Sequence, residues 1–212
     1  WIYPKSSCII CQSNKVLDYF KDISLRAELV VIPNPINDEA ITNKVANRRR
    51  KVIVGVGRLN KQKNFDLLIN SFNLIKHEFP EYNIEIYGQG PEKQHLLDLI
   101  KSLGLNERIT LMGTRDKVME TIYDSSLYVM SSNFEGFPNA LAMASGLPVI
   151  CTDFPTGTAN EIIENGKNGY IVPVGDEEKM SIAMRKILNS NKLQQEMSFE
   201  NKKIKGQIKV IK

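Results

Sequence analysis

From residue 51 onward, short apolar runs alternate with amphipathic stretches along the chain. These runs are apolar at nearly every position rather than at every second one, which is typical of strands that helices cover on both faces of a parallel sheet. The predicted strands are residues 52–56, 84–87, 109–112, 127–130, 148–151 and 170–172. The pattern therefore predicts a doubly wound, Rossmann-like α/β domain with right-handed crossovers.

The stretches between these strands repeat apolar residues at the spacing of amphipathic helices. The residues expected on the buried helix faces are Phe65, Leu68, Phe72, Ile75, Leu96, Leu97, Ile100, Ile182, Met184, Ile187 and Leu188. Both ends of the chain depart from this pattern. Residues 6–12 predict a strand followed by a short helix, and a polar linker over residues 37–51 then enters the domain, as at the exit from another domain. Residues 191–212 are rich in Lys, Gln and Asn and predict a truncated helical segment.

The composition fits an ordinary folded protein, with 42% hydrophobic and 25% charged residues. A formal net charge of +4 suits an anionic ligand but is too small to indicate a nucleic-acid-binding protein. Sparse cysteines argue against a disulfide framework and favour a cytoplasmic location. Cys8 and Cys11 have the spacing of half a zinc site, but no second Cys/His pair follows, so we expect buried thiols. No apolar run approaches the length of about 20 residues that a helix needs to cross a bilayer. Any membrane contact would therefore be peripheral, at the inner face of the membrane.

The loop after the first predicted strand is rich in glycine and followed by cations. Ligands of doubly wound domains bind at the carboxyl ends of the strands, where this loop lies. Arg58 offers a planar fork for phosphate oxygens and Lys63 a point charge, so the loop suits a diphosphate. Taken alone, it is more consistent with a solvated turn carrying surface cations. A dinucleotide site is disfavoured because Gly55-x-Gly57 lacks the third glycine of that fingerprint.

The loop after the fourth strand holds a carboxylate, Glu135, directly before a glycine and near the expected start of a helix. Its carboxylate could accept hydrogen bonds from sugar hydroxyls while neighbouring backbone amides hold a phosphate. The alternative, equally supported by the residues alone, is that Glu135 only complements the dipole of the helix.

Four segments together resemble the retaining glycosyltransferases of family 4, the glycosyl transferases group 1. The segments are Gly57-Arg58-Leu59 with Lys63, SSNFEGFPNAL from Ser131, MASGLPVICTD from Met143 and EIIENGKNGYIVPVGD from Glu161. They occur in the order and spacing of that family, which makes the resemblance specific. Those enzymes have the GT-B fold, in which an acceptor domain and a nucleotide-sugar-binding domain face a cleft. The resemblance implies that residues 1–35 are a remnant of the acceptor domain and hinge, residues 36–190 the donor domain, and residues 191–212 the truncated helical segment.

The same resemblance implies roles for individual residues. Arg58 and Lys63 would neutralise the departing diphosphate without a metal or other cofactor, and Glu135 would contact the donor sugar, which makes these three the expected catalytic residues. The remaining expected donor-binding residues are Gly57, Gly113, Thr114, Arg115, Gly136, Phe137, Pro138, Asn139 and Leu141. A UDP-sugar is the favoured donor because UDP is the commonest donor nucleotide. The implied acceptor is a glycan or lipid-linked molecule held by the other domain, so we expect this chain alone to be inactive.

One departure from the family pattern follows Leu141, where Ala142 comes two residues too early. As a result, this sequence lacks the second glutamate of the family's Glu-x7-Glu motif, which binds the ribose hydroxyls in members of that family. Because removing two residues rotates the rest of a helix by about 200°, a true deletion would disturb folding or donor binding. We hypothesise that the natural chain has two further residues here. Intact-mass measurement tests this hypothesis.

Other polar residues have weaker claims to a role. His77 and His95 are expected on the polar faces of helices. Glu161 is expected at a helix start, where it would complement the helix dipole or cap the helix, and the resemblance adds a contact with the donor. The basic cluster at residues 48–51 is expected to be a solvated linker edge, with an anionic membrane surface as the alternative. Two alternatives to transfer stay open: a nucleotide-sugar epimerase of the same architecture, and a non-catalytic nucleotide-sugar-binding module.

Overall fold

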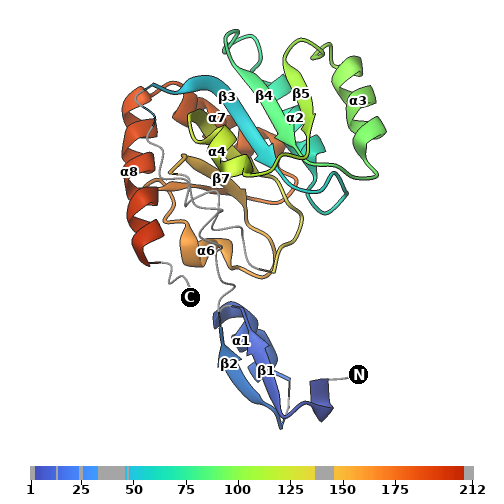
Figure 1. Cartoon of the computed structure of the whole chain (residues 1–212), viewed down its shortest axis with the longest axis vertical. Helices are drawn as coiled ribbons and strands as arrows, with labels where there is room; N and C mark the ends of the chain where they lie inside the picture. Colours follow the sequence, from blue (N-terminus) through green and yellow to red (C-terminus); the bar gives the residue numbers. More distant parts are fainter. Residues whose placement is uncertain are drawn as a thin grey trace.

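The computed structural model describes residues 3–12, 14–23, 26–32, 46, 48–136 and 146–207. Within this part of the chain, the main body is a six-stranded parallel sheet in the order β5-β4-β3-β6-β7-β8 (Figure 1). The strands are β3 (Arg50–Val56), β4 (Asn83–Tyr87), β5 (Ile109–Gly113), β6 (Ser125–Met130), β7 (Val149–Thr152) and β8 (Gly169–Val172). The first strand of this sheet lies at its middle, and the chain winds outward from it in both directions. This is the Rossmann strand order, so the predicted fold class and the predicted strands are confirmed.

Helices cover both faces of the sheet. On one face, α2 (Phe65–Asn73), α3 (Lys93–Ser102) and α7 (Glu177–Leu188) share a core with alternate residues of the strands, Ile53 among them. On the other face, α4 (Val118–Ile122) and α6 (Ala159–Ile162) pack on a second core that includes Val52 and Val54. Successive residues of β3 are thus buried in opposite cores, which explains why the strands are apolar without alternation.

The prediction that residues on the helix faces are buried is wrong for two of them. Leu97 is 39% exposed and Ile182 is 47% exposed, whereas the adjacent Leu96 and Ala183 are buried. Consecutive residues of a helix point about 100° apart, so a residue beside the apolar stripe faces solvent although its neighbour is buried. The other expected helix-face residues, including Phe72 and Ile187, are buried in the larger core.

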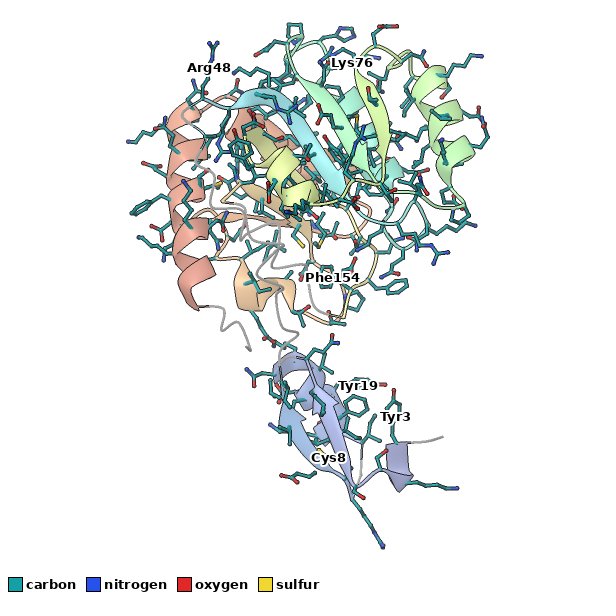
Figure 2. The ribbon with its side chains drawn as sticks, in the orientation of Figure 1. Tyr3, Cys8, Tyr19, Arg48, Lys76 and Phe154 are labelled. Carbon is teal, nitrogen blue, oxygen red and sulfur yellow. The ribbon has the colours of Figure 1, made fainter. Side chains whose placement is uncertain are left out.

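The first residues form a smaller unit. It holds a short 3₁₀ turn (Tyr3–Lys5), the parallel strands β1 (Cys8–Cys11) and β2 (Glu28–Val31), and α1 (Asn14–Lys21), and Figure 1 shows it set below the main domain. Strand β1 is buried only at alternate positions, so Cys11 is buried whereas Cys8, labelled in Figure 2, is exposed. The expectation of buried thiols is therefore wrong for Cys8, because β1 has a covering layer on one face only.

The final helix, α8 (Asn191–Gln207), lies where a helical segment was predicted. It packs against the domain through Met197, which belongs to the larger core. Asn201 is also buried, and its side-chain amide donates hydrogen bonds to the carbonyl oxygens of Leu147 and Asn168, both at 2.7 Å. Among the described helices, none combines the length and apolar character that crossing a bilayer requires.

Candidate functional site

The candidate site lies at the carboxyl edge of the sheet, where β3 and β6 are neighbours. From β3 the chain winds toward β4 and from β6 toward β7, so the two following loops diverge at this point. Such a topological switch leaves a crevice, and it is where doubly wound domains bind their ligands. The loops concerned are residues 57–64 and residues 131–136.

Lys63 and Glu135 join these two loops. Lys63 Nζ lies 2.5 Å from Glu135 Oε1, and their side chains are only 18% and 12% exposed. The hydroxyl of Ser132 donates to the same carboxylate oxygen at 2.6 Å. A pair screened from water in this way interacts more strongly than a surface ion pair, so the carboxylate and the ammonium are held in fixed positions.

The path of the Lys63 side chain depends on Gly57. A Cβ atom added at Gly57 would lie 2.9 Å from Lys63 Cε and 3.0 Å from Cδ, which is closer than non-bonded carbons approach. The lysine stem therefore runs across the bare backbone of Gly57 toward Glu135. The structure thus brings together Gly57, Lys63 and Glu135, which the sequence placed in two separate segments.

Backbone and amide hydrogen bonds fasten the two loops to each other. Asn133 donates from its backbone to the Gln62 carbonyl and from its side chain to the Lys61 carbonyl, each at 2.8 Å. Its side-chain oxygen accepts from Asn64 Nδ2 at 2.9 Å, and Asn64 itself adopts a left-handed conformation (φ 45°) at the start of α2. Asparagine tolerates this conformation better than most residues. These hydrogen bonds hold the two loops against each other around the Lys63–Glu135 ion pair.

A pocket of about 320 Å³ opens beside Gly57 at the same edge of the sheet. Its lining includes Arg58, a predicted catalytic residue, and Thr114 and Arg115, two predicted donor-binding residues, and all three are exposed to solvent. Gly113, the last residue of β5, has φ +70° and accepts a hydrogen bond from the backbone N–H of Gly88 at 2.9 Å. The loops after β3, β4 and β5 thus line one pocket, to which Arg58 and Arg115 contribute.

An ionic network lies beneath this pocket. Tyr87, which lines the pocket, donates to Glu85 Oε2 at 2.6 Å, and Glu85 pairs with Arg50 at 2.8 Å. Arg50 also pairs with Asp124 at 2.9 Å. Burial, and then the hydrogen bond to Glu85, raise the pKa of Tyr87 to about 12. Tyr87 therefore stays a neutral hydrogen-bond donor at physiological pH, and the network ties the floor of the pocket to the sheet.

Sequence reasoning missed Ser132, Thr156 and Thr158 as functional positions. Thr156 Oγ1 donates to the Glu135 carbonyl at 2.8 Å, and Thr158 Oγ1 donates to the Gly136 carbonyl at 3.4 Å. Both threonines follow β7, so their position after a strand at the carboxyl edge was the signal that could have found them. The other predicted donor-binding residues, Phe137, Pro138, Asn139 and Leu141, lie outside the described residues, as does the junction between Leu141 and Ala142.

Glu161 lies in the first turn of α6, where its charge complements the helix dipole as expected. It does not cap its own helix α6; instead its Oε1 atom accepts a hydrogen bond from the Lys15 backbone N–H at 3.0 Å, near the start of α1. His95 is exposed as expected and contacts Asp66 Oδ2 at 2.5 Å, and His77 is exposed in a turn rather than in a helix. Neither histidine lines the pockets described here.

Sequence comparison assigns the family. The model of the family "Glycosyl transferases group 1" matches residues 37–204, which is most of the chain. The chain belongs to this family. One relative of this glycosyl transferases group 1 chain is the N-acetylgalactosamine-N,N'-diacetylbacillosaminyl-diphospho-undecaprenol 4-alpha-N-acetylgalactosaminyltransferase of Campylobacter jejuni, 31% identical over 208 residues, covering 95% of this chain and 55% of the relative. Another is the GtfA subunit of a UDP-N-acetylglucosamine–peptide N-acetylglucosaminyltransferase of Streptococcus agalactiae, 34% identical over 167 residues, covering 76% of this chain and 32% of the relative.

Solved structures agree with this assignment at the level of fold. Staphylococcus aureus TarM, crystallised as a mutant with fondaparinux, α-GlcNAc-glycerol and UDP, superposes with a TM-score of 0.88 over 99% of this chain and 42% of TarM, at 22% identity. The likeness confirms the Rossmann-like half of a GT-B glycosyltransferase. This group 1 chain spans about half, or less, of the length of the relatives named here.

Proposed function

We propose that this chain is the donor-binding half of a retaining glycosyltransferase that moves a hexosyl group from a UDP-sugar to a glycan or lipid-linked acceptor. The observation that carries the proposal is the Lys63–Glu135 pair, which lies at the topological switch point and beside a pocket whose lining includes Arg58 and Arg115. Membership of the glycosyl transferases group 1 supports the reaction class. It also favours transfer over an epimerase or a binding module.

The arrangement suggests a separate role in the reaction for each of three side chains. The pocket beside Gly57 receives the nucleoside diphosphate, with Arg58 as a planar donor to phosphate oxygens. Lys63 neutralises the charge that grows on the diphosphate as the sugar–oxygen bond breaks. Glu135, fixed by Ser132 and Lys63, accepts hydrogen bonds from hydroxyls of the sugar. Transfer by these groups needs no metal or other cofactor, so we expect transfer by the whole protein to persist in EDTA.

The relatives favour UDP as the nucleotide. The streptococcal relative is named for a UDP-N-acetylglucosamine donor, and the TarM structure contains UDP. The Campylobacter relative is named for an undecaprenol-linked acceptor, which supports a lipid-linked acceptor and peripheral contact with the inner face of the membrane. The acceptor would be bound largely by residues outside this chain, so we expect donor binding but no transfer by the chain alone.

Calorimetric titration with UDP, GDP and ADP tests the donor site. We expect saturable binding of UDP that weakens about 10- to 100-fold in Arg58→Ala and in Lys63→Met, because each loses a charged contact to phosphate. Since Lys63→Met leaves a partly buried carboxylate unpaired, the double variant Lys63→Met/Glu135→Gln should be made beside it. Lys61→Ala is the matched control, because Lys61 lies exposed in the same loop and contributes only its backbone carbonyl.

The outcomes separate the alternatives. Equal loss of affinity in Lys61→Ala and Arg58→Ala would contradict a specific diphosphate site. Binding of UDP without transfer by the whole protein would favour the non-catalytic module. Where transfer occurs, the anomeric configuration of the product, measured by NMR, tests retention.

A further inference from the structure

A second pocket lies away from the candidate donor site, between α8 and the start of β3. We call it the α8 pocket. It has a volume of about 590 Å³, larger than the pocket beside Gly57, and its lining includes Arg48, Arg49, Lys51, Gln194, Ser198 and Lys202. Four of these side chains are cationic, and no carboxylate lines the pocket in the described part of the chain. The basic cluster of the sequence is thus not a uniform solvated edge.

Arg49 is the fixed cation of the α8 pocket. Its guanidinium donates to the carbonyl oxygens of Ser125 at 2.5 Å and Gly146 at 2.9 Å, and to Ser198 Oγ at 2.6 Å. None of these partners carries a charge. Asp124 is close enough to interact electrostatically with Arg49, but it already forms an ion pair with Arg50. Burial lowers the pKa of Arg49 to about 10, which still leaves it cationic at neutral pH. Arg49 thus has no counter-ion of its own among the described residues, and a half-buried cation in that state is costly unless an anion joins it.

The other three cations of the α8 pocket differ in how firmly they are held. Lys51 donates to the Tyr82 hydroxyl at 3.1 Å and lies over its ring. Arg48 and Lys202 are exposed, and neither forms an ion pair among the described residues. The stem of Lys202 lies along Gly146, where a Cβ would be 3.0 Å from Lys202 Cε. Two exposed cations and the hydrogen-bonded guanidinium of Arg49 therefore line the same space.

The α8 pocket is far from the donor loops. Figure 2 labels Arg48 beside the first turn of α8, at the amino end of β3, whereas Gly57 follows the carboxyl end of this strand. A strand advances about 3.3 Å per residue, so the seven residues of β3 separate the two sites by about 20 Å. A single small ligand cannot occupy both.

We propose that the α8 pocket is a second anion-binding site that takes an organic phosphate, either a soluble phosphate ester or the headgroup of a phospholipid. Guanidinium and ammonium groups arranged around one space match the several acceptor oxygens of a phosphate. The volume exceeds that of a phosphate alone and leaves room for the organic group attached to it. This site is independent of the proposed transfer function and is tested separately.

NMR titration of the full chain with glycerol 3-phosphate locates the binding. We expect saturable shifts of the backbone amides of Gln194 and Ser198 that are distinct from any shifts at Gly57 and Thr114. In Arg48→Gln/Lys202→Gln, the affinity measured at Gln194 and Ser198 should fall about tenfold or more, because two charged contacts are lost. Higher salt should weaken binding in the wild type, since both side chains are exposed to the screening ions.

The matched control is Lys179→Gln/Lys192→Gln, which removes the same charge at exposed lysines of α7 and α8 that do not line the pocket. Arg48→Gln and Lys202→Gln are also made as single variants, so that a misfolded double variant does not end the test. Shifts at Gln194 and Ser198 that persist equally in the test and control variants would overturn the proposal. The proposal would also be overturned if glycerol 3-phosphate caused no shifts at Gln194 and Ser198 and the chain did not bind phosphatidylglycerol vesicles.

Sedimentation with vesicles distinguishes the two sources of phosphate. Binding to phosphatidylglycerol vesicles but not to phosphatidylcholine vesicles, lost in Arg48→Gln/Lys202→Gln and kept in the lysine control, assigns the site to a lipid headgroup. Binding of glycerol 3-phosphate without vesicle binding assigns it to a soluble ester. Vesicle binding that is unchanged in the test variant would place membrane contact elsewhere and count against a lipid headgroup in this pocket.

Discussion

At the residue scale, Gly88 shows how the absence of one side chain shapes the candidate site. A Cβ atom at Gly88 would lie 1.8 Å from the carbonyl oxygen of Gly57. Neither group can move freely, because Gly88 donates to Gly113 and Gly57 donates to Tyr87, each at 2.9 Å. The loops after β3 and β4 can therefore touch only where a glycine is present.

Gly88→Ala should consequently destabilise the fold and weaken UDP binding together. Overpacking at a site without room costs about 1–3 kcal/mol, and here the clash is with backbone. Urea unfolding measures the loss of stability, and calorimetry the affinity. Gly104→Ala is the control, since Gly104 has φ +65° but nothing within 4 Å of an added Cβ. It should cost about 1 kcal/mol of backbone strain and leave UDP affinity unchanged. Equal costs at the two glycines would contradict the close approach.

The three cysteines should differ in reactivity. Cys8 is exposed, whereas Cys11 and Cys151 are buried. Burial raises the pKa of Cys151 to about 12 and also raises the pKa of Cys11. Because the thiolate is the reactive form, raised pKa values lower reactivity at pH 8. We expect one thiol to react rapidly with Ellman's reagent and Cys8→Ser to abolish this phase. A fast phase that survives in Cys8→Ser would show that the buried thiols are accessible.

At the scale of elements, the candidate site depends on loops that are far apart in sequence. Lys63 and Glu135 were both predicted as site residues, but their contact was not, because nothing in a sequence without homologues indicates which side chains meet. What could be predicted was the edge of the sheet, since apolar strands separated by helices imply a parallel sheet and one carboxyl edge. The roles of Thr156 and Thr158 could not be predicted because they act through hydrogen bonds to backbone carbonyls of another loop.

Asn133 is the residue on which the coupling of these loops depends most. Its side chain donates to Lys61 and accepts from Asn64. Asn133→Ala removes both bonds and should cost about 1–3 kcal/mol in unfolding free energy, with UDP affinity falling because Glu135 and Lys63 lose their fixed separation. Asn160→Ala provides a control, since the Asn160 side chain makes one exposed bond to Asp153. A loss confined to stability, with affinity unchanged, would mean that the loops need not be held together for donor binding.

At the scale of the whole molecule, the six-stranded Rossmann-like domain is preceded in the chain by the smaller unit of β1, α1 and β2. The contact between them was not predicted, because it joins a carboxylate of one unit to a backbone amide of the other. Glu161 had been considered only for its own helix or for the donor. Every residue except proline has a backbone N–H donor, so the sequence gives no sign of which one a distant carboxylate will reach.

The Glu161–Lys15 bond should restrain α1 against the domain. The first amides of a helix lack partners within the helix, and a carboxylate that accepts from one of them stabilises the helix start by about 0.5–1 kcal/mol at an exposed site. In Glu161→Ala, hydrogen exchange of α1 amides should therefore accelerate about two- to fivefold, while amides of β3 and β6 keep their protection. Glu161→Gln should lie between, since it keeps an acceptor oxygen without the charge. Glu164→Ala is the matched control, because Glu164 is exposed nearby and its side chain pairs, within the described part of the chain, only with Lys167, three residues along. Exchange in α1 that is the same in Glu161→Ala and Glu164→Ala would show that the smaller unit is held to the domain by other contacts.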